Sequence, residues 1–186
     1  MTRILGVDPS LTGTGLAHLD TDDHLVIPTT TITTTGTQAA TLDDRRHRLL
    51  TIVETVVYTA VDHKTQLAVI EAPSLAQKSQ AGTLDRHGLW WLLITRLAEA
   101  RIPTTTVAPT ARAKYATGKG NAGKDAVLLA VAKRYPHVDV QDNNQADALV
   151  LAAIGARLAG HPIEDGLPKA NVEALAKITR PTGVAA

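Results

Sequence analysis

Three carboxylates stand where the chain could bring them together. Asp8 and Glu71 each end a short apolar stretch that is typical of a central strand, and Asp147 lies near the start of a long apolar stretch typical of a helix. Adjacent strands lie about 4.8 Å apart, so carboxylates at the ends of two neighbouring strands can converge. A helix laid across the sheet can bring its first turns to the same place. Asn144, three residues before Asp147, shares that helix face if the helix begins early enough.

The chemistry of such a group is metal chemistry. Carboxylate and amide oxygens are ligands for hard divalent cations such as Mg²⁺ or Mn²⁺. Two ions about 4 Å apart can hold a phosphodiester, activate water and stabilise the leaving oxygen. Without a cation, three neighbouring carboxylates repel one another and raise one another's pKa. We therefore expect a cation wherever these acids converge.

Each acid also has a purely structural interpretation. Asp8 precedes Pro9 and could start a turn. Glu71 could end a strand and pair with a nearby basic residue, and Asp147 could be stabilised by the helix dipole while Asp142 caps the helix. Each signal is weak alone, and their occurrence together favours a site.

The elements that position these residues follow from the spacing of apolar residues. We expect strands at 3–8, 15–19, 25–35, 66–71 and 102–107, and helices at 42–61, 84–100, 124–135 and 145–158. This order predicts an α/β fold, a mixed five-stranded sheet with helices on both faces. Residues 1–159 are expected to form the domain, and residues 160–186 a peripheral C-terminal tail with a weak helix at 168–178.

Composition limits the size of the domain, the kinds of metal site and the cellular location that the chain can have. The chain has 186 residues, enough for one domain with a sizeable core, and no cysteine, so disulfides and thiolate metal sites are excluded. The seven histidines lack a metal-binding spacing. There is no apolar run long enough to span a membrane and no leader-like N-terminus. We expect a cytoplasmic protein.

The net charge of +1 hides a basic middle third. Residues 74–135 carry ten Lys and Arg against three acids, and Lys119 and Lys124 lie in the glycine-rich stretch "GKGNAGK". That stretch is not a Walker loop, because its spacing is wrong and no Ser or Thr follows the lysine. It is either a solvated loop or, as the nearby carboxylates favour, a contact with a phosphodiester backbone. Lys78 and Arg86 extend the predicted patch.

Two adjacent tryptophans, Trp90 and Trp91, could serve as base-stacking platforms. At helical spacing, at least one of them is expected in the core. The other could face a helix of a second subunit, and a core residue with an interface residue is favoured over base stacking.

Four motifs together resemble the RuvC family of Holliday-junction resolvases, and look most similar to RuvC-like nucleases of bacteriophages. They are "ILGVDPSLTGTGLA", "LAVIEAPS", "VAPTARAKYATGKGNAGKDAV" and "ADALVLAAIGA", and the similarity covers about residues 3–158. The resemblance implies a ribonuclease-H-like fold in the bacterial cell. It also implies a homodimeric, Mg²⁺-dependent endonuclease that cleaves branched DNA, with two ions per site and Mn²⁺ as a possible substitute.

The resemblance also implies roles for single residues. Asp8, Glu71 and Asp147 fall on the family's three acidic positions. Asn144 stands at the fourth, which is usually Asp or His, and Asp142 is a possible substitute acting from the preceding loop. Further implied roles fall on Lys124, which matches a family lysine near the scissile phosphate, and on Lys114, which lies near a second.

The sequence departs from the family pattern after Glu71, where the family often carries an aromatic residue that stacks on junction bases. The stretch "EAPSLAQKSQ" has none. Leu75 could insert between bases, although a loop or core role is the simpler interpretation.

Two other functions remain open at this point. One is a DNA-junction-binding protein with weak or no cleavage activity, which the Asn at position 144 favours. The other is an ATP-binding module of the actin and sugar-kinase type, whose first phosphate loop looks like "GVDPSLTGTG". A chain of 186 residues is too short for the two lobes of such a module.

Overall fold

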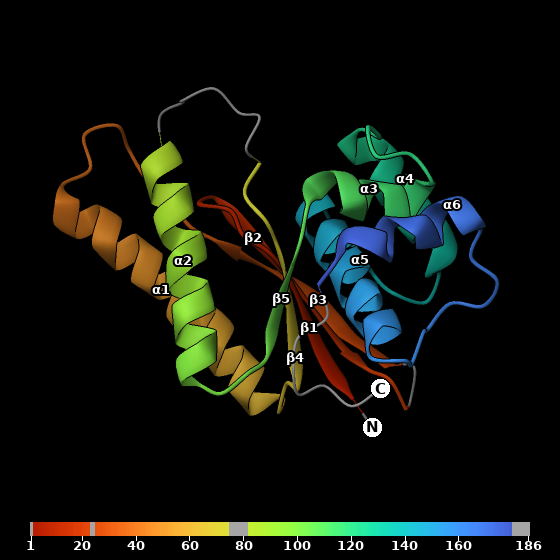
Figure 1. Ribbon diagram of the computed structural model, residues 1–186. Coiled ribbons are helices and arrows are strands. Elements are labelled where there is room, and N and C mark those ends of the chain that lie inside the picture. The colour runs from red at the N-terminus through yellow and green to blue at the C-terminus, as the bar shows by residue number, and fades with distance from the viewer. Residues whose placement is uncertain (1, 23–24, 75–81, 180–186) are drawn as a thin grey trace.

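The centre of the molecule is a mixed five-stranded sheet (Figure 1). A computed structural model describes residues 2–22, 25–74 and 82–179. The strand order is β3-β2-β1-β4-β5, with β1 antiparallel to β2, β2 antiparallel to β3, and β4 and β5 parallel to β1. The strands are β1 (Arg3–Asp8), β2 (Gly13–Asp20), β3 (Leu25–Thr33), β4 (Leu67–Glu71) and β5 (Thr104–Val107). The predicted fold class is confirmed.

Helices cover both faces of the sheet, and Figure 1 shows the two layers on either side. One face packs against α1 (Leu42–Asp62) and α2 (Thr83–Glu99), and the other against α5 (Asn143–Leu158). Around α5 lie α3 (Pro109–Thr117), α4 (Lys124–Arg134), the short α6 (Lys169–Val172) and the 3₁₀ helix η1 (Glu173–Lys177). Within the described part of the chain, no helix is long and apolar enough to cross a membrane.

Glycines let α5 lie unusually close to the middle of the sheet. A Cβ atom on Gly6 of β1 would stand 2.0 Å from the carbonyl oxygen of Ala148, and one on Gly15 of β2 would stand 2.1 Å from that of Asn144. Both distances are far below van der Waals contact, so any side chain at either position would push α5 away. The close approach brings the first turns of α5 to the end of β1.

The structure differs from the sequence prediction mainly around α3 and the start of α5. Helix α3 was not predicted, because it is short and its buried face consists of an arginine, a tyrosine and two alanines, so it gives a weak apolar signal. Helix α5 begins at Asn143, two residues earlier than expected. Asp142 caps it, and its Oδ1 accepts a hydrogen bond from the Gln145 N–H at 2.8 Å.

The segment after residue 159 packs against α3 and α5. The buried Glu164 carboxylate accepts hydrogen bonds from the hydroxyls of Tyr115, at 2.9 Å, and Tyr135, at 2.5 Å, and forms an ion pair with Arg157 at 3.1 Å. Asn171 in α6 is also buried. This segment is therefore held to the domain as far as residue 179, and the predicted boundary at 159 stays a prediction.

Candidate active site

The register of β1 and β4 brings the first two acids together. Val7 pairs with Ile70 in the parallel ladder, so Asp8 and Glu71 occupy the next positions at the carboxyl ends of the two strands. Successive side chains point to opposite faces of a strand. Ile4 packs in the cluster that contains α5, and Asp8 lies four residues later on the same face.

Helix α5 supplies the third acid. Asp147 directly precedes Ala148, whose carbonyl lies over Gly6, and only 2% of Asp147 is exposed. Burial raises the pKa of Asp8 well above its usual value, and the charges of Glu71 and Asp147 raise it further. Burial, together with the charge of Glu71, raises the pKa of Asp147 to about 6 despite a nearby arginine. The three predicted acids therefore converge closely enough to repel one another.

The arginine is Arg112, a residue that the sequence did not single out. Its Nε donates to Oε2 of Glu71 and its Nη1 donates to Oδ1 of Asp147, so one guanidinium bridges two acids. Burial alone lowers the pKa of Arg112, but these carboxylates outweigh it and raise that pKa above its ordinary value. In "TARAKYA" the sequence offers no signal that distinguishes Arg112 from Lys114 two residues later.

The donor chemistry fits a divalent cation, but the observed geometry is not a finished metal site. Asp8, Glu71 and Asp147 offer only carboxylate oxygens, which hard cations prefer. Burial, together with the charges of neighbouring acids, raises the pKa values of Asp8 and Asp147. Among the residues that the structure describes, no group of three or more His, Asp or Glu side chains is placed to hold an ion. Arg112 instead engages two of the three acids.

The two candidates for a fourth ligand differ in what they already contact. Asn144 lies in the first turn of α5, with its side-chain amide against Gly13. Asp142 uses one oxygen to cap α5, and its other oxygen accepts a hydrogen bond from the Thr31 hydroxyl at 2.7 Å. Asp142 therefore has a structural role, as the cap interpretation predicted.

The predicted DNA-binding residues differ in how near they lie to the three acids and in what they contact. Lys124, at the start of α4, is close enough to lower the pKa values of Asp8 and Asp147. Lys114 pairs with Glu173 at 3.2 Å instead of with the site. Lys119 is exposed in the loop before α4. Lys78 and Leu75 lie outside the described residues.

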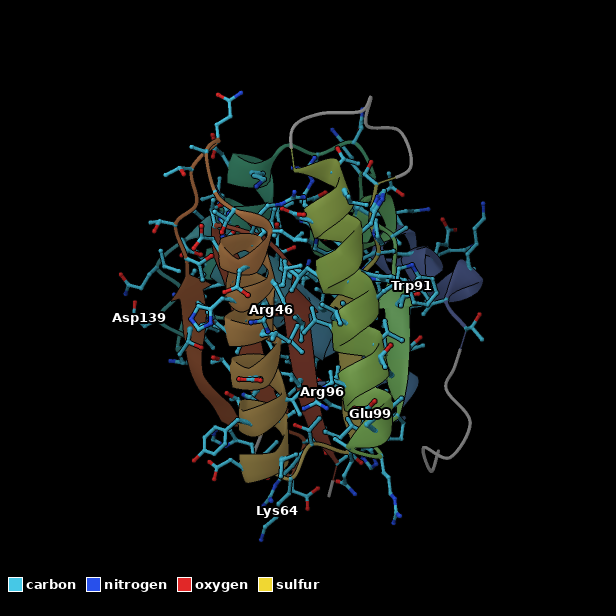
Figure 2. The ribbon with its side chains drawn as sticks, turned by 90° about the vertical axis from the view of Figure 1, so that its left-hand side faces the viewer. Arg46, Lys64, Trp91, Arg96, Glu99 and Asp139 are labelled. Atoms are coloured by element: carbon cyan, nitrogen blue, oxygen red, sulfur yellow. The ribbon has the colours of Figure 1, made fainter. Side chains whose placement is uncertain are left out.

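A pocket of about 310 Å³ opens beside the acids, with Asp8, Glu71, Arg86 and Trp90 among its lining residues. Trp90 is half-buried, and its Nε1 donates to the carbonyl oxygen of Glu71 at 3.1 Å, which ties α2 to the end of β4. Trp91 is 62% exposed on α2, in the face shown in Figure 2. The core prediction thus holds for Trp90 in part, and the interface role of Trp91 stays a prediction.

Comparisons with known proteins agree with one another. The family model described as "Crossover junction endodeoxyribonuclease RuvC" matches residues 4–155. A curated protein of that name from Paracidovorax citrulli is 30% identical over 152 residues, 81% of each chain. One from Chlamydia trachomatis is 29% identical over 87% of this chain and 94% of its own.

Solved structures show the same fold at lower identity. The Thermus thermophilus RuvC structure has a TM-score of 0.67 at 16% identity, covering 86% of this chain and 98% of its own. The T. thermophilus RuvC in complex with Holliday junction substrate has a TM-score of 0.64 at 17% identity, covering 82% and 90%.

Proposed function

The chain belongs to the RuvC family of crossover junction endodeoxyribonucleases, and from this premise we propose that it is a metal-dependent, structure-selective nuclease that cleaves Holliday junctions or other branched DNA. The observation that carries the proposal is the convergence of Asp8, Glu71 and Asp147 at one end of the sheet. Family membership favours this interpretation over an ATP-binding module.

In this proposal Asp8, Glu71 and Asp147 hold divalent cations, with two Mg²⁺ ions per site and Mn²⁺ as a substitute. When bound, such ions supply an activated water and neutralise charge on the reacting phosphate. Asn144 completes the ligand set in preference to Asp142, because both oxygens of Asp142 already accept hydrogen bonds. The amide is uncharged, so this site carries one negative charge fewer than a site with four carboxylates.

The chain's own cations bind and orient the DNA. Lys124 stands near the acids and donates to a non-bridging oxygen of the scissile phosphate. Arg86, which lines the pocket beside the acids, and the exposed Lys119 contact the backbone. Lys114 contacts it by exchanging Glu173 for a phosphate, and Lys78 stays a predicted DNA contact. Such contacts make affinity fall steeply with salt, because phosphate binding releases counterions.

We also propose that the protein acts as a homodimer in the bacterial cytoplasm. On α2, Leu84 is 75% exposed and Trp91 is 62% exposed, and these two apolar side chains could be covered by a second subunit. A two-fold axis near α2 would give two equivalent sites for a four-way junction. Sedimentation velocity should show a dimer, and conversion to a monomer by Trp91→Ala would locate the contact on this helix.

The central test is cleavage by Asp8→Asn. We expect this variant to lose at least about 1000-fold in Mg²⁺-dependent cleavage of a synthetic four-way junction, because one ligand charge is removed, while junction binding persists. A flap and a linear duplex, assayed beside the junction, define substrate selectivity. Arg46→Gln on the surface of α1 is the matched control and should cleave normally.

The same assay separates the nuclease from a junction-binding protein without activity. The engagement of two acids by Arg112 is the observation that favours the second candidate. Junction binding by the wild type with no cleavage in Mg²⁺ or Mn²⁺ would support that candidate. Full activity of Asp8→Asn would contradict the proposed site.

A further inference from the structure

The guanidinium of Arg112 occupies an unusual position for a basic residue of a DNA-binding protein. Arg112 is 7% exposed and directs its donors inward, Nε to Glu71 and Nη1 to Asp147. A buried arginine aimed at phosphates would face outward instead. Its partners are two of the three acids that are proposed to bind cations.

The helix that carries Arg112 is fixed by contacts of its last turn. The Asn171 side chain donates to the carbonyl oxygen of Tyr115 at 2.8 Å, and the Tyr115 hydroxyl donates to Glu164. The Arg134 guanidinium donates to the carbonyl of Ala116 at 2.6 Å and to that of Tyr115 at 3.2 Å. The backbone of α3 is therefore anchored, and the part of Arg112 with freedom to move is its long side chain.

The charges at the site do not balance. Three carboxylates share one fully engaged cation, with Lys124 exposed at the margin. A cation placed between Glu71 and Asp147 would compete for the two carboxylates that Arg112 bridges through Oε2 and Oδ1. The guanidinium and a divalent cation would also repel strongly at that distance.

We propose that Arg112 is an internal counter-ion, which holds Glu71 and Asp147 in position before a divalent cation binds and is displaced when the cation arrives. This inference rests on the proposed metal-dependent function. Arg112 is a positioning residue in this scheme. Its displacement is a rotation about the bonds of the Arg112 side chain, and the cost of breaking two buried ion pairs weakens metal binding.

The test measures metal binding directly. We will compare wild type, Arg112→Gln and the surface control Arg46→Gln by titration with Mn²⁺, with free Mn²⁺ followed by electron paramagnetic resonance. We expect Arg112→Gln to bind Mn²⁺ about tenfold more tightly than wild type, because a competing charge has gone. In EDTA the same variant should melt several degrees lower than wild type, and Mn²⁺ should raise its melting temperature more.

The outcomes separate this inference from the proposed function. Suppose that the wild type binds Mn²⁺ and cleaves junctions. Equal or weaker Mn²⁺ binding by Arg112→Gln then overturns the counter-ion role and leaves the proposed function standing. Absence of Mn²⁺ binding by wild type overturns both. Tighter binding by Arg46→Gln to the same extent would show a non-specific charge effect and would also overturn the inference.

A measurement on the wild type covers the case in which Arg112→Gln does not fold. The Nε–Hε signal of a buried, paired arginine is slow to exchange with water and can be followed by nuclear magnetic resonance. We expect the signal of Arg112, assigned through Arg112→Lys, to shift or broaden as Mg²⁺ is added. An unchanged, protected signal at saturating Mg²⁺ would contradict displacement.

Discussion

Two buried charged clusters contact α3, one through Arg112 and the other through Tyr115, and they are built in opposite ways. In the first, one carboxylate, Glu164, is surrounded by donors, namely the hydroxyls of Tyr115 and Tyr135 and the guanidinium of Arg157. In the second, three carboxylates gather around one bridging guanidinium, that of Arg112. The first cluster satisfies its acid, and the second leaves its acids short of positive charge.

The difference indicates that the first cluster is structural and favours a functional role for the second. Buried polar groups stabilise a fold when every member has its partners. An excess of like charge costs stability, and a chain retains it where chemistry needs it. The Glu164 cluster ties the C-terminal segment to α3, whereas the acids at the end of β1 and β4 are available to a ligand that supplies the missing charge.

Exchanging an acid for its amide should therefore have opposite effects in the two clusters. We expect Glu164→Gln to lower the free energy of unfolding by about 3 kcal/mol, because it leaves Arg157 without its counter-charge. Asp8→Asn should raise that free energy by about 1 kcal/mol at pH 7 without metal, because it relieves repulsion. Urea denaturation in EDTA measures both. A loss of stability in Asp8→Asn comparable with that in Glu164→Gln would break the distinction.

A third buried polar group, His18, gives a test that uses the pH dependence of the free energy of unfolding. His18 on β2 has no hydrogen-bond partner for its buried Nε2 and lies 4.4 Å from the ring of His63. Burial, with a smaller contribution from His63, lowers the pKa of His18 to about 4 from its ordinary 6.5. The unfolded chain then binds more protons between these values, so this stabilising contribution is complete above pH 6.5 and is lost as the pH falls toward 4.

The contribution of His18 to the pH dependence can be isolated with His18→Leu, which fills the position with an apolar side chain that does not titrate. Between pH 7 and pH 5 the wild type should lose about 2 kcal/mol more of its unfolding free energy than the variant does. The difference between the two proteins is the informative quantity, because protonation of Asp147, whose pKa is raised, changes stability in the opposite direction. Parallel pH profiles would show that His18 does not titrate in this way.

Much of the site could be predicted from the sequence, because strand ends are local features. The apolar runs that end at Asp8 and Glu71 identified two acids that converge in the structure. Asp147 followed from the start of an apolar helix. The sequence could not decide between Asn144 and Asp142, because that choice depends on where α5 begins, and this is set by the cap that Asp142 forms.

Arg112 could not be predicted for a different reason. Its helix gives only a weak apolar signal. The role of its side chain depends on contacts with Glu71 and Asp147, which are 41 and 35 residues away in the sequence. Lys114, two residues later, was among the predicted DNA-binding residues, but it pairs with Glu173 on the other side of α3. The rotation of one helix decides which of two basic residues enters the site.

The sequence by itself determined the mixed sheet, the identity of the three acids and their place at the ends of elements. These properties depend on hydrophobic periodicity and on turn and cap residues, which act over a few positions. Only the tertiary structure decided how close the acids come and what lies between them. The close contact of α5 with Gly6 and Gly15 determines how near Asp147 comes to the strand ends. The orientation of α3, held by Glu164, determines that the guanidinium of Arg112 lies between the acids.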